Sequence, residues 1–488
     1  DKNIFNKDVV RKLNIMSIRE SNTISESFID NISNEDIKEQ AKYLIEQFKD
    51  AKEIGSLLIL NNNDYSILEK YINDDNTIFG IELREKIIPL IQLSNILSKK
   101  YDVVVTNPPY INSNFMSKNL KDYIVDRYKD VKYDLFSAFI VRNNQFSKEN
   151  GNLGFMTPYV WMFISSYEKL RRYLIDNACI TSLIQFEYSA FEEATVPICT
   201  FTLKKTDKLK KGIYFRLVDY KGGMKVQEKM FFEEKENQKY YIREVDEFNR
   251  VPGSPIVYWL SNNMFNAFQI GQPLYKMGDT RQGMATSDVN RFTRFWYEVN
   301  DSQIGFNYNS LDGTKNGVHK WFPYIKGGKF RKWSGNNGTL VNWQFDGKEV
   351  KDYAAKLYKS YTRTIKNIGY YLRECISWGM ITSSDISVRY YDSGYIFDIA
   401  GCCLFAEHKN LIYLLAFLNT KIARELTKAI NPTINMNVGD IANLPIIYEE
   451  KYNSQIEKII EENISISKRE WDSFETSWDF KKHPLINM

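Results

Sequence analysis

The chain has 488 residues, of which 65 are Lys or Arg and 61 are Asp or Glu, so its net charge is +4 with histidine neutral. A chain of this length is expected to form two or three domains with a sizeable core, and its weak positive charge permits nucleic-acid binding without demanding it. We find no signal peptide and no apolar run long enough to cross a bilayer, so we expect a cytoplasmic protein with no membrane contact.

Cysteine and histidine are scarce in this chain. It contains five cysteines, which lack the paired spacing of metal-ligand motifs, and three histidines. We therefore expect no zinc site and predict no other metal site. The odd number and scattered placement of the cysteines fit a reducing compartment.

Two helices are expected before the first strand. Residues 34–52 have the spacing of an amphipathic helix, with Ser33 as its N-cap. Its apolar face consists of Ile37, Ala41, Leu44, Ile45 and Phe48. A second helix is predicted over residues 84–99 and leads into a strand that begins at Tyr101.

A strand followed by a rigid turn is the most informative part of the sequence. The valine run at residues 103–105 has no polar alternation, which predicts a strand buried on both faces of a mainly parallel sheet. Asn-Pro-Pro-Tyr follows at residues 107–110, and its two prolines end the strand and hold the backbone extended. Ligands bind at the carboxyl ends of strands in open α/β sheets, so we expect a binding site here.

These four residues suit methyl transfer to the exocyclic amino group of a base. The side-chain oxygen of Asn107 and the carbonyl of Pro108 can accept hydrogen bonds from the amino group without adding a charge beside a sulfonium donor. Tyr110 offers a flat face on which a base that has left the duplex can stack. The structural alternative is a strand that ends in an ordinary proline turn.

The tetrapeptide Asn107-Pro108-Pro109-Tyr110 after an apolar strand resembles motif IV of the S-adenosylmethionine-dependent amino methyltransferases, which modify adenine N6 and, in a minority, protein glutamine. Residues 100–110, 133–140, 161–171, 320–333 and 471–480 together resemble the adenine-specific DNA methyltransferases of the BREX phage-exclusion systems. The resemblance implies S-adenosylmethionine as cofactor and double-stranded DNA as partner. Other phage-defence proteins are further candidate partners.

The resemblance also implies an aromatic residue on the opposite face of the flipped base. Residues 151–158 look like the next strand entry, followed by a helix over residues 165–175. Residues 191–201 are similar to motif VIII of the family, with a strand over residues 196–203, and this alignment gives the role to Phe191. A core phenylalanine at a strand entry is the alternative.

The donor-binding part of the fold is not found before Asn107. Such enzymes need a glycine-rich turn after the first strand and a carboxylate at the end of the second strand. The resemblance places that turn upstream of Asp1. Residues 78–82, Ile-Phe-Gly-Ile-Glu, resemble the second-strand acid motif, which names Glu82, together with Asn107, as a candidate cofactor-binding residue. The alternative places Glu82 at the exposed start of a helix.

The second half of the chain is richer in glycine, tryptophan and tyrosine and resembles a target-recognition domain. Residues 315–345 contain six Lys or Arg and no Asp or Glu, with aromatic residues interleaved. Basic side chains can bind phosphates while rings stack on bases, although an exposed, half-buried strand has the same pattern. The predicted DNA contacts are Arg281, Arg291, Arg294, Lys320, Lys326, Lys329, Arg331 and Lys332.

We therefore predict an α/β, Rossmann-like methyltransferase core, its donor-binding part missing, followed by a mixed α+β target-recognition domain. The expected segments are a helical segment (1–55), the catalytic part (56–205), a β-rich linker (206–260), the recognition domain (261–450) and a C-terminal helical segment (451–488). The expected activity is methylation of adenine N6 by base flipping in phage defence. Three alternatives stay open: a protein-glutamine methyltransferase, part of a fused restriction-modification enzyme, and a catalytically idle DNA-binding or scaffold module.

Overall fold

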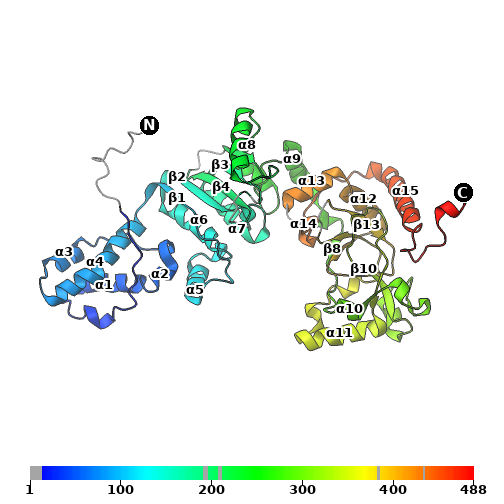
Figure 1. Ribbon diagram of the computed structural model, residues 1–488, viewed down its shortest axis with the longest axis horizontal. Coiled ribbons are helices and arrows are strands. Elements are labelled where there is room, and N and C mark those ends of the chain that lie inside the picture. Colours follow the sequence, from blue (N-terminus) through cyan, green and yellow to red (C-terminus); the bar gives the residue numbers. More distant parts are fainter. Residues whose placement is uncertain are drawn as a thin grey trace. The chain divides into compact units, whose positions relative to one another are not determined.

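The computed structural model describes residues 14–188, 190, 196–206, 211–381, 385–431 and 435–487 (Figure 1). The chain divides into two compact units, Asp1–Phe248 and Asn249–Met488. In the described part of the chain, no helix is both long enough and apolar enough to span a membrane.

Helices precede the first strand of the first unit. They are α1 (Glu35–Gln47), α2 (Ala51–Ile54), α3 (Ser66–Asp74) and α4 (Ile78–Ser98). The predicted apolar face of α1 is buried, but Asn34 rather than Ser33 caps the helix by accepting a hydrogen bond from the Ile37 amide at 3.1 Å. The predicted helix is also shorter, because Asp50 has φ 56° and separates α1 from α2.

One six-stranded sheet forms the centre of the first unit, in the order β1-β2-β4-β3-β5-β6. The strands are β1 (Tyr101–Thr106), β2 (Ser147–Pro158), β3 (Cys179–Gln185), β4 (Ile198–Lys204), β5 (Lys211–Arg216) and β6 (Tyr241–Glu244). Parallel pairing joins β1 to β2 and β3 to β5, whereas β4 runs antiparallel between β2 and β3. The predicted α/β core is thus confirmed.

Four helices lie between these strands in the chain. They are α5 (Lys118–Arg127), α6 (Leu135–Phe146), α7 (Glu168–Asn177) and α8 (Met224–Glu236). Buried Arg142 of α6 donates hydrogen bonds to the backbone carbonyls of Leu97 at 2.9 Å and Ser56 at 3.1 Å, which ties the N-terminal helices to the sheet. Because β5 and β6 extend this sheet, residues 211–244 belong to the first unit, and the expected separate linker over residues 206–260 is wrong.

The strand that carries the tetrapeptide lies at the edge of the sheet. Among the described residues β1 pairs only with β2, and Val103 and Val105 are 60% and 75% exposed. The prediction of a strand buried on both faces is therefore wrong for the described chain. The valine run has the composition of a central strand but lacks the neighbours that would cover it.

The second unit is a mixed α+β fold, as predicted, built around two four-stranded sheets. One sheet contains β14 (Ile396–Phe397), β10 (Trp321–Ile325), β11 (Thr339–Asn342) and β9 (Thr293–Phe295) in that order. The other contains β13 (Val388–Tyr391), β12 (Cys375–Gly379), β15 (Gly401–Phe405) and β8 (Asp279–Arg281). A short pair joins β7 (Gln272–Pro273) to β16 (Pro445–Ile446).

Helices surround these sheets. They are α9 (Asn262–Ile270), α10 (Val289–Phe292), α11 (Gln344–Tyr358), α12 (His408–Leu418), α13 (Lys421–Ile430), α14 (Val438–Ala442) and α15 (Asn453–Trp471). Within this unit, Figure 1 shows α12 and α15 on one side of the strands and α10 and α11 on another. A buried cluster that includes Phe322, Tyr324, Trp343, Tyr371 and Phe397 forms the core.

Candidate active site and nucleic-acid interface

The tetrapeptide lies at the carboxyl end of β1, as predicted. Asn107 and Pro109 are exposed, Pro108 is buried and Tyr110 is half-buried. The Tyr110 hydroxyl lies 3.0 Å from Asn107 Oδ1 and 3.1 Å from the Met156 carbonyl oxygen on β2, so it can donate to either acceptor. The contact between the Tyr110 hydroxyl and Oδ1 holds the Asn107 side chain beside the end of the sheet.

Aromatic side chains support Tyr110. Its ring meets the Phe136 ring edge-on at a centroid distance of 6.5 Å, and Phe136 stacks on Tyr167 at 5.6 Å. The Tyr110 ring also packs against a buried cluster that contains Phe186, Ala190, Ile198 and Leu217. Burial raises the pKa of Tyr110, so its hydroxyl stays protonated at neutral pH and remains a donor.

Asp134 is a site residue that our sequence analysis did not single out. The segment after the tetrapeptide is joined to the neighbours of Asp134 by two backbone hydrogen bonds, in which the Leu135 amide donates to the Ile111 carbonyl at 2.9 Å and the Ser113 amide donates to the Tyr133 carbonyl at 3.0 Å. Burial raises the pKa of Asp134 to about 6, and the neighbouring amides of Phe136, Leu135 and Ile111 offset this only in part. The available signal was a polar residue in the stretch Tyr-Asp-Leu-Phe at residues 133–136, which is part of the resemblance to the methyltransferases.

The raised pKa of Asp134 predicts a pH-dependent stability. Since the folded-state pKa lies above the usual 3.8, the folded protein binds more protons, and this contribution to stability is lost as pH rises from about 4 to 6. Asp134→Asn is therefore expected to stabilise the first unit at pH 7.5 by about 1 to 2 kcal/mol, a value reduced for partial exposure.

Urea unfolding followed by circular dichroism measures this change. The gain should disappear at pH 4, where Asp134 is largely protonated and resembles asparagine. Asp122→Asn on exposed α5 serves as the control and should change little at either pH. An equal gain for Asp134→Asn at both pH values would rule out the titration of this carboxyl as its cause.

Glu82 does not lie at the end of a strand. Thr77 caps α4 by accepting a hydrogen bond from the Gly80 amide at 3.2 Å, so residues 78–82 form the start of a helix. Glu82 is exposed there, with one oxygen 3.7 Å from the Lys86 ammonium. The strand interpretation is wrong and the helix alternative is confirmed, which removes the basis for ribose binding by Glu82.

Phe191 and the donor-binding side are the remaining parts of the predicted site. Phe191 lies outside the described residues, so its role stays a prediction. Before β1, the described residues form helices and no strand, and Gly55 and Gly80 are the only glycines of the sequence before Asn107. The described residues thus place the Asn107 side-chain oxygen at the end of β1, and they include no strand before β1 that could carry a glycine-rich donor-binding turn.

Five of the eight predicted DNA contacts are engaged within the second unit, and one of them, Arg294, donates to backbone carbonyls of its own segment. Three arginines form ion pairs, and the ammonium of one lysine donates to a backbone carbonyl. The pairs are Arg281 with Asp279, Arg291 with Glu349, Arg331 with Glu470, and Lys332 with the Asn419 carbonyl. Three of the interleaved rings, Trp321, Phe322 and Tyr324, are buried in the core, whereas Phe330 is 55% exposed. Residues 321–325 form a strand, but all five are buried, so the alternative of an exposed, half-buried strand does not describe them either.

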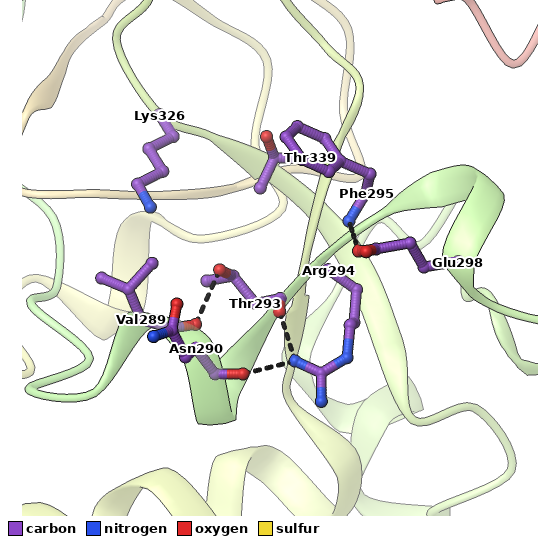
Figure 2. Close-up of a pocket in the computed structure, with 8 residues that line it drawn as sticks. All are labelled: Val289, Asn290, Thr293, Arg294, Phe295, Glu298, Lys326 and Thr339. Atoms are coloured by element: carbon purple, nitrogen blue, oxygen red, sulfur yellow. Dashed lines mark hydrogen bonds between the residues drawn. The ribbon is translucent and has the colours of Figure 1, made fainter.

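Arg294 and Lys326, both predicted contacts, line one pocket of about 430 Å³ (Figure 2). Arg294 donates to the Thr293 carbonyl at 2.7 Å, and the Lys326 ammonium points toward Asn290 and Thr293. Lys326 has no carboxylate partner among the residues that the structure describes. Beside the pocket, the rings of Phe295 and Tyr297 stack at 5.4 Å with an interplanar angle of 9°.

This pocket combines the groups that a nucleic acid backbone requires. It offers an ammonium, a guanidinium, the amide of Asn290 and the hydroxyls of Thr293 and Thr339, and its one carboxylate, Glu298, accepts a hydrogen bond from the Phe295 amide at 2.7 Å. Phe295 and Tyr297 are 52% and 61% exposed, so their stacked rings are open to a base. A phosphate held by the cations with a base against the rings is the arrangement that such a surface suits.

Comparison with known proteins finds a matching family model for the first part of the chain. Residues 5–191 match the family model described as Eco57I restriction-modification methylase. Among solved structures, the type IIL restriction-modification enzyme MmeI in complex with DNA has a TM-score of 0.49 and 12% identity, covering 78% of this chain and 50% of that chain.

Particular relatives come from the curated proteins. The chain is 31% identical over 458 residues to the adenine-specific methyltransferase BrxX of Escherichia coli O9:H4 (strain HS), covering 90% of this chain and 36% of BrxX. It is 32% identical over 464 residues to the adenine-specific methyltransferase PglX of Lacticaseibacillus casei (strain Zhang), covering 90% of this chain and 38% of PglX. The predicted resemblance is thus confirmed, and the chain spans little more than a third of the length of these two relatives.

Proposed function

We propose that this chain supplies the base-binding part and the target-recognition unit of a site-specific DNA methyltransferase that modifies adenine N6 in a BREX-type defence system. The observation that carries the proposal is the Asn107 to Tyr110 tetrapeptide at the carboxyl end of β1, with Asn107 Oδ1 exposed to solvent and held by Tyr110. The similarity to BrxX and PglX over 90% of the chain supports the choice of adenine.

Asn107 acts on the amino group of the base. A carboxamide oxygen has two lone pairs, so Oδ1 can accept one hydrogen bond from Tyr110 and another from the adenine amino group. A second acceptor, the Pro108 carbonyl, holds the other amino hydrogen. Together they favour the tetrahedral geometry in which the nitrogen lone pair leaves the ring and becomes nucleophilic.

The cofactor in this proposal is S-adenosylmethionine, which supplies the methyl group on a sulfonium when a donor-binding part holds it. The side chains described above act on the acceptor alone: they bind the amino group, orient it and exclude water from one side. An adenine in a duplex cannot reach the end of β1, so it must rotate out of the stack. Phe191 is proposed to cover its second face.

The pocket around Lys326 contacts the DNA backbone in this proposal. Lys326→Ala is expected to weaken duplex binding several-fold and to reduce the slope of log affinity against log salt by about 1, because one ammonium no longer displaces a counterion. Fluorescence anisotropy at several salt concentrations measures both quantities.

The control for Lys326 is Lys86→Ala on α4, which removes the same charge from the first unit, where Lys86 neighbours Glu82. Equal losses for the two variants would show that net charge alone causes the effect, and Lys326 would then have no phosphate contact.

One alternative has a specific observation in its favour. The described residues before β1 form helices and no strand that could carry a donor-binding turn, as expected of a catalytically idle DNA-binding module. Long-read sequencing of DNA from cells with and without the gene separates the two functions. Modified adenines in one shared motif, present only with the gene, support the methyltransferase, and unmodified DNA supports the idle module.

A further inference from the structure

Three side chains of the second unit converge where α12 begins. One potential ligand atom from each of His408, Glu457 and Glu461 lies within 4.8 Å of the other two. His408 is the first residue of α12, and the two glutamates are one turn apart on α15, so they project from the same face of that helix. The α12 and α15 helices pack against each other.

A fourth side chain fixes the orientation of the His408 ring. His408 Nδ1 lies 2.6 Å from Glu374 Oε1, and the Tyr390 hydroxyl donates to the same oxygen at 2.5 Å. A carboxylate at Nδ1 makes this nitrogen the N–H donor, which leaves the lone pair of Nε2 available. Metal-binding histidines in proteins are held by carboxylates in the same way.

We propose that His408, Glu457 and Glu461 bind a first-row divalent cation, with Zn²⁺ as the preferred ion. One imidazole nitrogen and two carboxylate oxygens are ligands that zinc accepts, and the two negative charges offset those of the ion. The neighbouring ammonium of Lys409 lies 2.8 Å from its own carboxylate partner, Glu450. Our expectation of no metal site was based on the spacing of cysteines and histidines. Two of the three proposed ligands are glutamates on α15, so that spacing could not reveal them.

The bound ion joins the start of α12 to the first half of α15. Farther along, α15 holds Arg331, whose guanidinium pairs with Glu470 and donates to the Ser467 carbonyl at 2.8 Å. The buried residues of α15 are Asn453 and Ile460, both in its first half. The ion therefore stabilises the second unit by fastening its longest C-terminal helix.

The test is a zinc titration of the whole chain, without a histidine tag and stripped of metal with EDTA. Isothermal calorimetry should show one ion bound per chain with saturation, and the melting temperature of the second unit should rise as zinc is added. Zn²⁺ should bind more tightly than Mg²⁺, because the site contains an imidazole nitrogen.

Variants assign the binding to these residues. His408→Ala and the double variant Glu457→Gln/Glu461→Gln should abolish the specific binding. Glu374→Gln retains all three ligands but should weaken zinc affinity about 10- to 100-fold, because the ring loses its orienting carboxylate. Glu462→Gln, an exposed neighbour on α15, should bind zinc as the parent chain does.

Three results would overturn the proposal. They are a lack of saturable binding below about 1 mM zinc, unchanged affinity in His408→Ala, and Mg²⁺ binding as tight as that of Zn²⁺. Far-UV circular dichroism confirms that each variant is folded. If His408→Ala does not fold, the glutamine variants decide the outcome. Glutamine has almost the same volume as glutamate, so these variants are expected to fold.

Discussion

Asn107→Ala is expected to lower the rate of adenine methylation about 10²- to 10³-fold, the usual cost of removing one hydrogen-bonding group that acts on the reacting atoms. The methyl group of alanine cannot accept a hydrogen bond, so the amino nitrogen stays conjugated with its ring. Tritium transfer from S-adenosylmethionine to a duplex containing the recognised site measures the rate. The assay uses a polypeptide in which a donor-binding part precedes this chain.

Two further variants make this experiment specific. Tyr110→Phe keeps the ring that packs on Phe136 but removes the hydroxyl that holds Asn107, so its loss should be smaller, about 10-fold. Asn114→Ala, in the exposed turn beyond the tetrapeptide, should leave the rate almost unchanged. If Asn107→Ala retained the parent rate, Asn107 could not be the group that binds the amino nitrogen.

The second large expected effect is the loss of methyl transfer when the chain is assayed without a donor-binding part. We expect no methyl transfer above background when this chain alone is incubated with S-adenosylmethionine and DNA, because its described residues include no strand before β1 that could carry the donor-binding turn. A donor-binding part supplied separately should restore transfer by covering the exposed valines of β1. Duplex binding, measured on the same preparation, should persist without it and shows that the chain is folded.

Val105→Asp tests where the donor-binding part docks. Val105 is 75% exposed. A carboxylate at this position should block the restoration of activity, because the donor-binding part would have to bury an unpaired charge in order to cover β1. Ile242→Asp is the matched control, since Ile242 is 55% exposed on β6 at the opposite edge of the sheet. Methylation by the chain alone would contradict the prediction that its donor pocket is incomplete.

Local patterns were predicted well because they depend on neighbours in the sequence. The apolar face of α1 follows the 3.6-residue period, and the end of β1 follows from the two prolines at positions 108 and 109. The cap of α1 was misplaced by one residue since Ser33 and Asn34 can both accept the amide. Glu82 was ambiguous because residues 78–82 are apolar enough for a strand, and the Thr77 cap makes them helical.

Features that depend on distant residues could not be predicted. The exposure of β1 follows from strand order, which the valine run does not encode. Arg331 was expected to contact DNA, but its partner Glu470 lies 139 positions away in the sequence. The orientation of Asn107 depends on the Tyr110 hydroxyl, and that contact requires the folded turn.

The Tyr110 hydroxyl has a single hydrogen and two acceptors at nearly equal distances, 3.0 Å and 3.1 Å. Rotation about its C–O bond transfers that hydrogen from Asn107 to the Met156 carbonyl without displacing any heavy atom. Asn107 then keeps both lone pairs for an incoming base, and the hydroxyl never lacks an acceptor. The Tyr110 hydroxyl can thus either hold the Asn107 oxygen or release it by donating to the backbone of β2, without any heavy atom changing place.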